Sequence, residues 1–305
     1  MLKESVALAM TLCFALSALA GGKNTRSLKV DHASICASQL EPLRAAFANA
    51  SLATDYGGPH ASGGTHMASL GFDDGSYLEL IAPMKPGGAD DSPWGKMIAS
   101  DAGTCAWAIA SNDIQSEAAR LKQAGIPVEG PAPGSRQRPD GKTIRWQTAQ
   151  IGPGGAGSVL PFMIEDKTAR ELRVKSSASV KGSGLAGISV VVIGVTDLNA
   201  SIALFRKAYG FSEPKTEEQK NFGARLAYFP GTSVMLATPL SNEGWLAKRL
   251  ETYGNSPVAF LLGTSNPTEA GRRFALTDRG TWFGKNVQWF DPDKLHGVRL
   301  GVMEQ

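Results

Sequence analysis

The chain has 305 residues, a formal net charge of +3, and 42% hydrophobic against 19% charged residues. This length allows two domains of ordinary size, and the composition is that of a folded globular protein rather than a disordered one. No run is rich in lysine and arginine, so nothing in the charge pattern indicates a nucleic-acid partner.

The first twenty residues are typical of a signal peptide. Lys3 precedes an apolar stretch from Val6 to Leu19, and the small residues up to Ala20 resemble a cleavage site. The apolar stretch is short for a membrane-spanning helix. We therefore expect export to the periplasm or the exterior after cleavage near Ala20, with no membrane segment in the mature form. A buried N-terminal helix is the alternative.

Removal of that segment would leave two cysteines, Cys36 and Cys105. Two cysteines in an exported protein can form a disulfide. Both residues lie in apolar, strand-like runs, however, where cysteine commonly serves as a small buried hydrophobic side chain. The sequence therefore favours buried, unpaired cysteines and leaves a disulfide as the alternative.

One pattern recurs four times along the rest of the chain. Each repeat has an apolar run typical of a strand, a helix-start signal, an amphipathic helix and further strand-like segments. The four apolar runs are Val30–Ala37, Cys105–Ala110, Ile188–Val195 and Pro257–Leu262. Internal repetition of this kind predicts repeated structural units, here each in the order β-α-β-β-β.

The third repeat shows the pattern most clearly. After the β-branched run, Thr196 and Asp197 offer a helix cap, and Gly210 is a typical helix end. Between them, apolar residues recur at helical spacing. They are Leu198, Ile202, Phe205 and Tyr209.

A polar, serine-rich and glycine-rich segment separates the second repeat from the third. It spans 167–184 and has the composition of an interdomain linker. The predicted organisation is therefore a signal peptide over 1–20, a first domain over 28–166, a linker over 167–184 and a second domain over 185–305.

Three of the four histidines fall within the first repeat. His32 lies in the first strand-like run, and His60 and His66 lie in a glycine-rich stretch. Glu79 lies in the last strand-like run of the same repeat. Two imidazoles and a carboxylate on different strands of one small sheet can converge on a metal ion or a polar substrate. The alternative is that Glu79 faces solvent on a half-exposed strand.

Residues 29–166 resemble the vicinal-oxygen-chelate superfamily, in particular its glyoxalase-like branch, and residues 186–303 resemble it in module pattern. The resemblance is carried by Asp31-His32, Gly63-Gly64-Thr65-His66, the run Asp74–Leu80, Arg138-Pro139-Asp140-Gly141, Arg145-Trp146 and the run Leu160–Ile164. It implies an α+β fold of four tandem βαβββ modules. These would pair into two glyoxalase-like domains with open, partly closed barrel sheets that cup a metal site.

Metal ligands in this superfamily usually come from the first and last strands of two modules. By this resemblance His32 and Glu79 are expected to be ligands, with His66 as a third. The corresponding positions of the second module are Ala106 and Phe162, neither of which can bind a metal.

In the third module the corresponding positions are Val190 and Met235, which cannot bind a metal either. The second domain is therefore expected to be degenerate. It would serve as a scaffold or as an interaction surface, for example in a homodimer.

The resemblance implies a divalent metal ion, Fe, Mn or Zn, that chelates substrate oxygens in the first cup. The expected protein is a lyase, isomerase or dioxygenase acting on a small oxygenated substrate. His60 and Glu79 are the expected catalytic residues, with His60 as the free base.

Further residues are expected to bind the substrate, because arginine pairs with carboxylates and aromatic rings pack on apolar groups. They are His66, Tyr77, Arg138, Arg145 and Trp146. In one alternative, the histidines bind the substrate by hydrogen bonds without a metal. In another, the cup is a non-catalytic site that sequesters a small hydrophobic or aromatic ligand.

Overall fold

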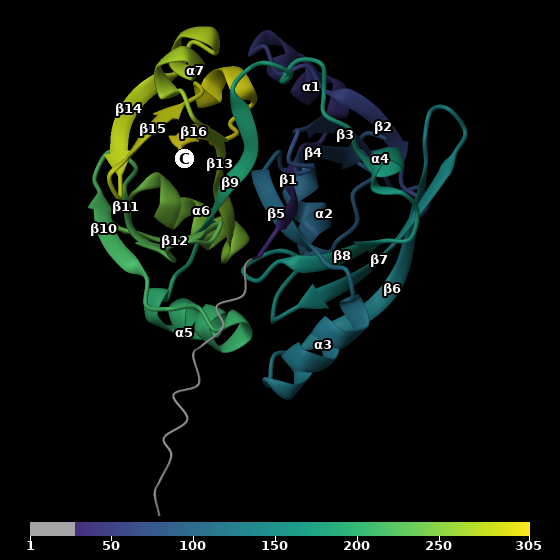
Figure 1. Cartoon of the computed structure of the whole chain (residues 1–305), viewed down its shortest axis with the longest axis horizontal. Coiled ribbons are helices and arrows are strands. Elements are labelled where there is room, and N and C mark those ends of the chain that lie inside the picture. Colours follow the sequence, from purple (N-terminus) through teal and green to yellow (C-terminus); the bar gives the residue numbers. More distant parts are fainter. Residues whose placement is uncertain (1–27) are drawn as a thin grey trace, which may run out of the picture.

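The computed structural model describes residues 28–305, and the expected signal peptide lies outside the described residues. The described chain forms two eight-stranded, curved sheets that lie side by side (Figure 1). Within this part of the chain, the helices are too short or too polar to cross a bilayer.

The first sheet is built from two units of the predicted order. Its strands are β1 (Val30–Cys36), β2 (Asp55–Pro59), β3 (Thr65–Gly71), β4 (Tyr77–Pro83), β5 (Gly103–Ala110), β6 (Val128–Gln137), β7 (Thr143–Ile151) and β8 (Phe162–Asp166). Helix α1 (Leu40–Asn49) follows β1, α3 (Ile114–Gln123) follows β5, and α2 (Pro93–Ala99) joins the units. The strand order β2-β3-β4-β1-β5-β8-β7-β6 makes β1 and β5 antiparallel neighbours at the centre.

The second sheet repeats this topology with the order β10-β11-β12-β9-β13-β16-β15-β14. Its strands are β9 (Leu185–Gly194), β10 (Lys215–Gln219), β11 (Ala224–Tyr228), β12 (Val234–Pro239), β13 (Ser256–Thr264), β14 (Thr277–Trp282), β15 (Lys285–Trp289) and β16 (Leu300–Glu304). Its helices are α5 (Leu198–Tyr209), α6 (Trp245–Tyr253), α7 (Pro267–Arg273) and the 3-10 turn η1 (Pro292–Leu295). The predicted α+β fold of four βαβββ modules is thus confirmed.

Local signals in the sequence explain where helices begin and end. The Asp197 carboxylate accepts a hydrogen bond from the Ala200 amide at 2.9 Å and caps α5. Gly210 ends α5 with φ of +70°, a conformation that favours glycine. The third repeat therefore folds locally as its capping residues predict.

The two sheets pack back to back through one face of their central strands. Ala33 and Ile35 of β1 share a hydrophobic core with Val191 and Ile193 of β9. Because side chains alternate along a strand, the residues between them point to the opposite, concave face. Because the two sheets pack on each other, one face of β1 is buried in the core. The other face is the one that can carry a site.

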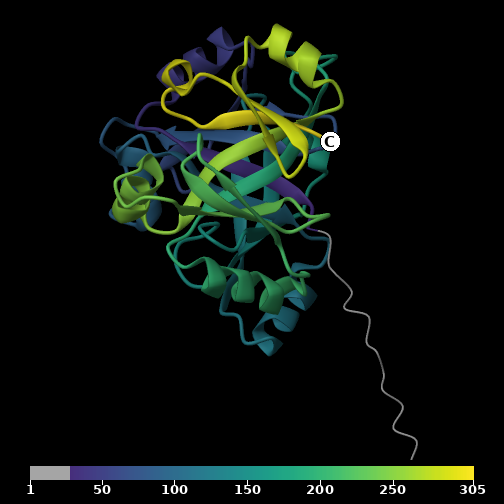
Figure 2. The ribbon, with the colours of Figure 1, turned by 90° about the vertical axis from the view of Figure 1, so that its left-hand side faces the viewer.

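Helices of the two sheets lie near one another across the boundary between the sheets. Figures 1 and 2 show α3 and α5 together at one end of the molecule and α1 and α7 at the other. Arg120 of α3 donates a hydrogen bond to the Ala208 carbonyl of α5 at 2.9 Å. Near the middle, the Thr104 hydroxyl of β5 donates to the Pro257 carbonyl of β13 at 2.9 Å.

The segment 167–184, predicted as a linker, joins the two sheets and packs on the first domain. It contains the short helix α4 (Arg170–Arg173). Ser177 is buried, and its hydroxyl accepts a hydrogen bond from the Gly71 amide at 3.1 Å. The segment is therefore a structural part of the first domain and not a free spacer.

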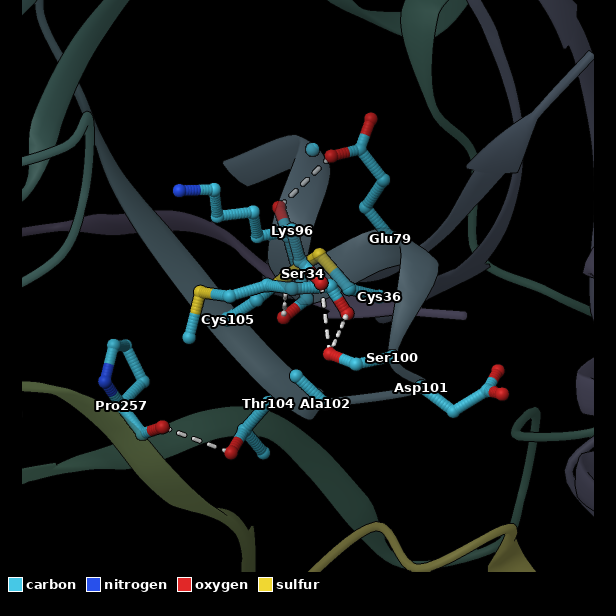
Figure 3. The surroundings of a disulfide bond; sticks show 12 residues. Ser34, Cys36, Glu79, Lys96, Ser100, Asp101, Ala102, Thr104, Cys105 and Pro257 are labelled. Carbon is cyan, nitrogen blue, oxygen red and sulfur yellow. Dashed lines mark hydrogen bonds between the residues drawn. A yellow bond between two sulfur atoms is a disulfide. The ribbon is translucent and has the colours of Figure 1, made fainter. Parts of the chain in front are cut away.

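Cys36 and Cys105 are buried, as expected, but they form a disulfide, so the expectation of unpaired cysteines was wrong (Figure 3). Their Cα atoms are 5.9 Å apart, since β1 and β5 are adjacent antiparallel strands. The sequence does not reveal that adjacency, because the two cysteines are 69 residues apart. The disulfide thus ties together the first strands of the two modules that form the cup.

We predict that the double variant Cys36→Ala/Cys105→Ala loses about 2–4 kcal/mol of unfolding free energy, because the cross-link restricts a long loop in the unfolded chain. Urea unfolding of the two proteins measures the loss. Wild type treated with a thiol reductant should show a similar decrease. Equal unfolding midpoints for all three samples would contradict the prediction.

Candidate functional site

A cavity of about 550 Å³ lies on the concave face of the first sheet. We call this cavity the first cup. Both modules of the domain contribute to its walls. The polar lining residues are His32, His60, Ser62, Thr65, Tyr77, Glu79, Glu129, Arg136, Thr148, Gln150 and Arg173, and the large apolar ones are Met67, Trp94, Trp146, Phe162 and Ile164.

Strand register places four side chains on the cup side of β1 and β4. In the parallel pair, His32 lies beside Tyr77 and Ser34 lies beside Glu79. The His32 ring stacks on Tyr77 at a centroid distance of 4.8 Å, and Phe162 meets the same ring edge-on at 5.3 Å. The predicted neighbourhood of His32, Tyr77 and Glu79 is therefore present in the structure.

Asp31 holds His32 in one orientation. Asp31 has no exposed surface, and its Oδ1 lies 2.7 Å from Nδ1 of His32. Burial alone would raise the pKa of Asp31, but hydrogen bonds from Arg173 and His32 outweigh it and hold that pKa far below its usual value. An ionised carboxylate only accepts hydrogen bonds, so Nδ1 of His32 carries a proton. Its Nε2 is then the atom presented to the cup.

Two arginines of α4 neutralise Asp31. Arg173 donates from Nη1 and Nη2 to the two carboxylate oxygens at 2.9 and 2.8 Å, and Arg170 also contacts Oδ2. Arg173 further donates to the Tyr77 hydroxyl at 2.9 Å and to Asp166. A residue from the expected linker thus binds the two strands that carry the site.

Glu79 is a buried carboxylate between two imidazoles. The Ser34 hydroxyl donates to Oε2 at 2.8 Å, Nε2 of His32 lies 3.8 Å from Oε2, and Nε2 of His60 lies 3.6 Å from Oε1. Burial alone would raise the pKa of Glu79, but His60, His32 and Ser34 together lower it to about 2. Glu79 is therefore ionised at neutral pH despite being only 6% exposed.

His60 lies where the edges of the first sheet approach each other. It follows β2 and pairs with Arg136 of β6 in an isolated antiparallel bridge. Its Nδ1 lies 2.8 Å from the Thr65 hydroxyl oxygen, and its side chain is 20% exposed. His60 is more exposed than His32, the other histidine beside Glu79. A free base must be accessible in this way to accept a proton from the substrate.

His66 is not part of this group, which corrects its expected roles as metal ligand and substrate contact. On β3, Thr65 and Met67 line the cup, so the alternation of side chains directs His66 to the outer face. There it lies beside Tyr56, with a centroid distance of 6.0 Å. Burial lowers the pKa of His66 below its usual value.

Arg138 and Arg145 also lie outside the cup, whereas Trp146 lines it as expected. Arg138 donates to the Leu172 carbonyl at 2.7 Å and pairs with Asp140. Arg145 is exposed, on the opposite face of β7 from Trp146. Their expected role as substrate contacts is not supported by these positions.

Two other arginines, Arg136 and Arg173, line the cup, and sequence reasoning missed both. Arg136 lies between Ser135 and Gln137, so no alternation of apolar and polar residues marks it as inward-facing. A signal for Arg173 did exist. Asp31 is a charged residue in an apolar run and needs a buried cation as partner.

The residues of the first cup do not form a metal cage as they are placed. His32, His60 and Glu79 have the donor types that Fe, Mn and Zn prefer. However, no group of three or more His, Cys, Asp or Glu within residues 28–305 is arranged to hold an ion. The carboxylate of Glu79 is instead engaged by Ser34 and flanked by the two imidazoles.

The concave face of the second sheet is filled by apolar side chains. Val190 and Met235, which correspond to His32 and Glu79, belong to a buried hydrophobic cluster there. Phe222 stacks on Trp289 in the same cluster at 5.4 Å. Packing thus takes the place of a polar site in this domain.

We predict that Glu79→Gln destabilises the protein at pH 7 and that the difference from wild type shrinks in acid. A pKa lowered from 4.5 to about 2 corresponds to on the order of 3 kcal/mol. This contribution is present above pH 4.5 and is lost as the pH falls towards 2. Urea unfolding at pH 7 and pH 3 measures it, with Glu251→Gln, an exposed residue outside the cup, as control. A difference of constant size at both pH values would contradict the prediction.

Comparison with known proteins agrees with this fold. The model of the glyoxalase-like domain family matches residues 30–199, more than half of the chain. No curated protein matches the sequence. A hypothetical protein from Staphylococcus aureus is 14% identical with a TM-score of 0.59, over 91% of this chain and 100% of that one. Methylmalonyl-CoA epimerase from Mycobacterium tuberculosis is 21% identical with a TM-score of 0.36, over 40% and 89%. The chain therefore belongs to the glyoxalase-like domain family.

Proposed function

We propose that the first cup is the active site of a lyase or isomerase that moves a proton on a small oxygenated substrate. One observation carries the proposal: a buried, ionised Glu79 lies between His32 and His60 on the wall of a cavity of about 550 Å³. Acid–base groups on the wall of a concave cavity of this size are typical of small-molecule enzymes.

His60 would act as the general base. Its Nε2 lies 3.6 Å from Glu79, so the carboxylate stabilises the imidazolium that forms when His60 accepts a proton. Glu79, with a pKa of about 2, is itself too weak a base for efficient proton abstraction near neutral pH. Its role would be to hold positive charge on the two imidazoles.

His32 would stabilise negative charge on the substrate oxygen. Asp31 holds the ring through Nδ1 and so directs Nε2 into the cup, where it would donate to that oxygen. A donor fixed in advance where an enolate oxygen develops lowers the barrier of such a reaction. Proton abstraction beside a carbonyl needs both this donor and the base.

A metal-dependent reaction, including a dioxygenase, is the second candidate. It is supported by the donor set, since two Nε2 atoms and one carboxylate face one another. His32, His60 and Glu79 would have to close around the ion. A third candidate is a binding protein that uses the cavity without turnover.

Export remains part of the proposal. The Cys36–Cys105 disulfide supports it, because structural disulfides persist mainly in oxidising compartments outside the cytosol.

We predict that the protein catalyses exchange of carbon-bound hydrogen for solvent deuterium in small ketones or 2-oxo acids, followed by NMR. His60→Gln should slow exchange about 100-fold or more, because general base catalysis is lost. His66→Gln, on the outer face, is the matched control and should stay within about threefold of wild type. Absence of exchange by wild type, or an unimpaired His60→Gln, would contradict the proposal.

Removal of metals separates the first two candidates. Protein treated with a chelator should keep its exchange rate if proton transfer relies on His60 and Glu79 alone. Loss of the rate, with recovery upon addition of Fe, Mn or Zn and one metal ion per chain, would favour the metal-dependent candidate.

A further inference from the structure

Arg136 is a buried cation whose hydrogen bonds go to uncharged groups, although the charge of Glu79 acts on it from elsewhere in the cup. It is 4% exposed, and its guanidinium donates to two backbone carbonyls, those of Gly57 and, at 3.0 Å, Arg173. Within residues 28–305 no carboxylate lies at ion-pair distance from it. Arg173, by contrast, is neutralised by Asp31 and Asp166. A buried charge left unpaired is costly, so a ligand that supplies the counter-charge is favoured.

The fold makes specific room for this guanidinium. A Cβ atom on Gly57 would lie 2.8 Å from Nη1 of Arg136 and 2.1 Å from the sulfur of Met67. Any larger residue would therefore displace the arginine or the methionine. The absent side chain lets the guanidinium pack directly on β2. Two carbonyls then hold it in place at the wall of the first cup.

The anionic group that Arg136 would bind is a monoanion. Two carboxylates, Glu79 and Glu129, line the same cup and would repel a group carrying two negative charges more strongly than a monoanion. Arginine binds a carboxylate through two parallel hydrogen bonds, and only two of its donors are used by carbonyls here. A carboxylate satisfies both requirements.

Large apolar and aromatic side chains form one part of the remaining wall. Trp146 and Phe162 line the cavity together with Met67, Ile164 and Trp94. Such a surface binds an apolar or aromatic group and excludes water around the charged end. The volume of about 550 Å³ accommodates a small organic molecule with both parts.

We infer that the first cup takes a small organic acid whose carboxylate binds Arg136 and whose apolar or aromatic body lies against Trp146 and Phe162. This inference names the substrate class of the proposed function. Turnover of the bound acid rests on that function, whereas the binding itself does not.

Equilibrium binding by calorimetry tests it with three probes: phenylpyruvate, phenylacetate and the uncharged phenylacetamide. Wild type should bind the two acids at least about 10-fold more tightly than the amide, as expected for a hydrogen-bonded charge. Arg136→Met should lose about 10- to 100-fold in affinity for the acids and little for the amide. Arg136→Lys should recover part of the loss. Arg145→Met, a surface arginine on β7, should bind all probes like wild type.

The outcomes separate this inference from the proposed reaction. If wild type prefers the acids in the manner described but exchanges no hydrogen, the substrate class stands and the catalytic proposal fails. Equal affinity for acids and amide, no binding of either acid at millimolar concentration, or an equal loss for all probes in a folded Arg136→Met would overturn the inference.

Discussion

The buried pair between Asp31 and the arginines of α4 is the interaction on which the first cup depends. Asp31 is fully buried on a central strand, so it is tolerated only because Arg173 and Arg170 neutralise it. Removing one partner of a buried ion pair typically costs about 3–5 kcal/mol, since the other charge remains without compensation. The same interaction fixes the proton on His32, which links stability directly to the chemistry of the site.

Arg173 extends this constraint to the rest of the cup. Its guanidinium contacts the Tyr77 hydroxyl, and its backbone carbonyl accepts a hydrogen bond from Arg136. The segment between the domains thereby orders residues on β1, β4 and β6. The arrangement suits a site that needs fixed charges, because groups held in place before the substrate arrives need not reorganise during the reaction.

The two domains share one topology but differ in the side chains on their concave faces. In the first, polar side chains on the concave face of β1 and β4 are kept in place by buried charges. In the second, Val190 and Met235 take the corresponding positions within a hydrophobic cluster. The second domain therefore contributes a packed surface to which the back of the first sheet is joined.

Much of the fold could be predicted from the sequence, because each βαβββ unit carries its own helix caps and strand periodicity. The approach of His32, Tyr77 and Glu79 followed from the pairing of first and last strands in a module. The position of His66 could not be derived from the sequence. Neither Thr65 nor Met67 shows clearly which of the two alternating sets of residues on β3 faces the cup. Arg136 was missed because no alternation of residues marks it as inward-facing. Arg173 was missed because its partner Asp31 lies 142 residues away, and the two cysteines were left unpaired because 69 residues separate them.

The most direct test of the central claim is the protonation state of His32, observed by ¹⁵N NMR of the labelled protein at neutral pH. If buried Asp31 fixes the imidazole, Nδ1 carries a proton that is protected from exchange with solvent. Observation of a neutral His32 ring protonated only on Nε2 would contradict the role assigned to Asp31 and, with it, the arrangement of charges proposed for the cup.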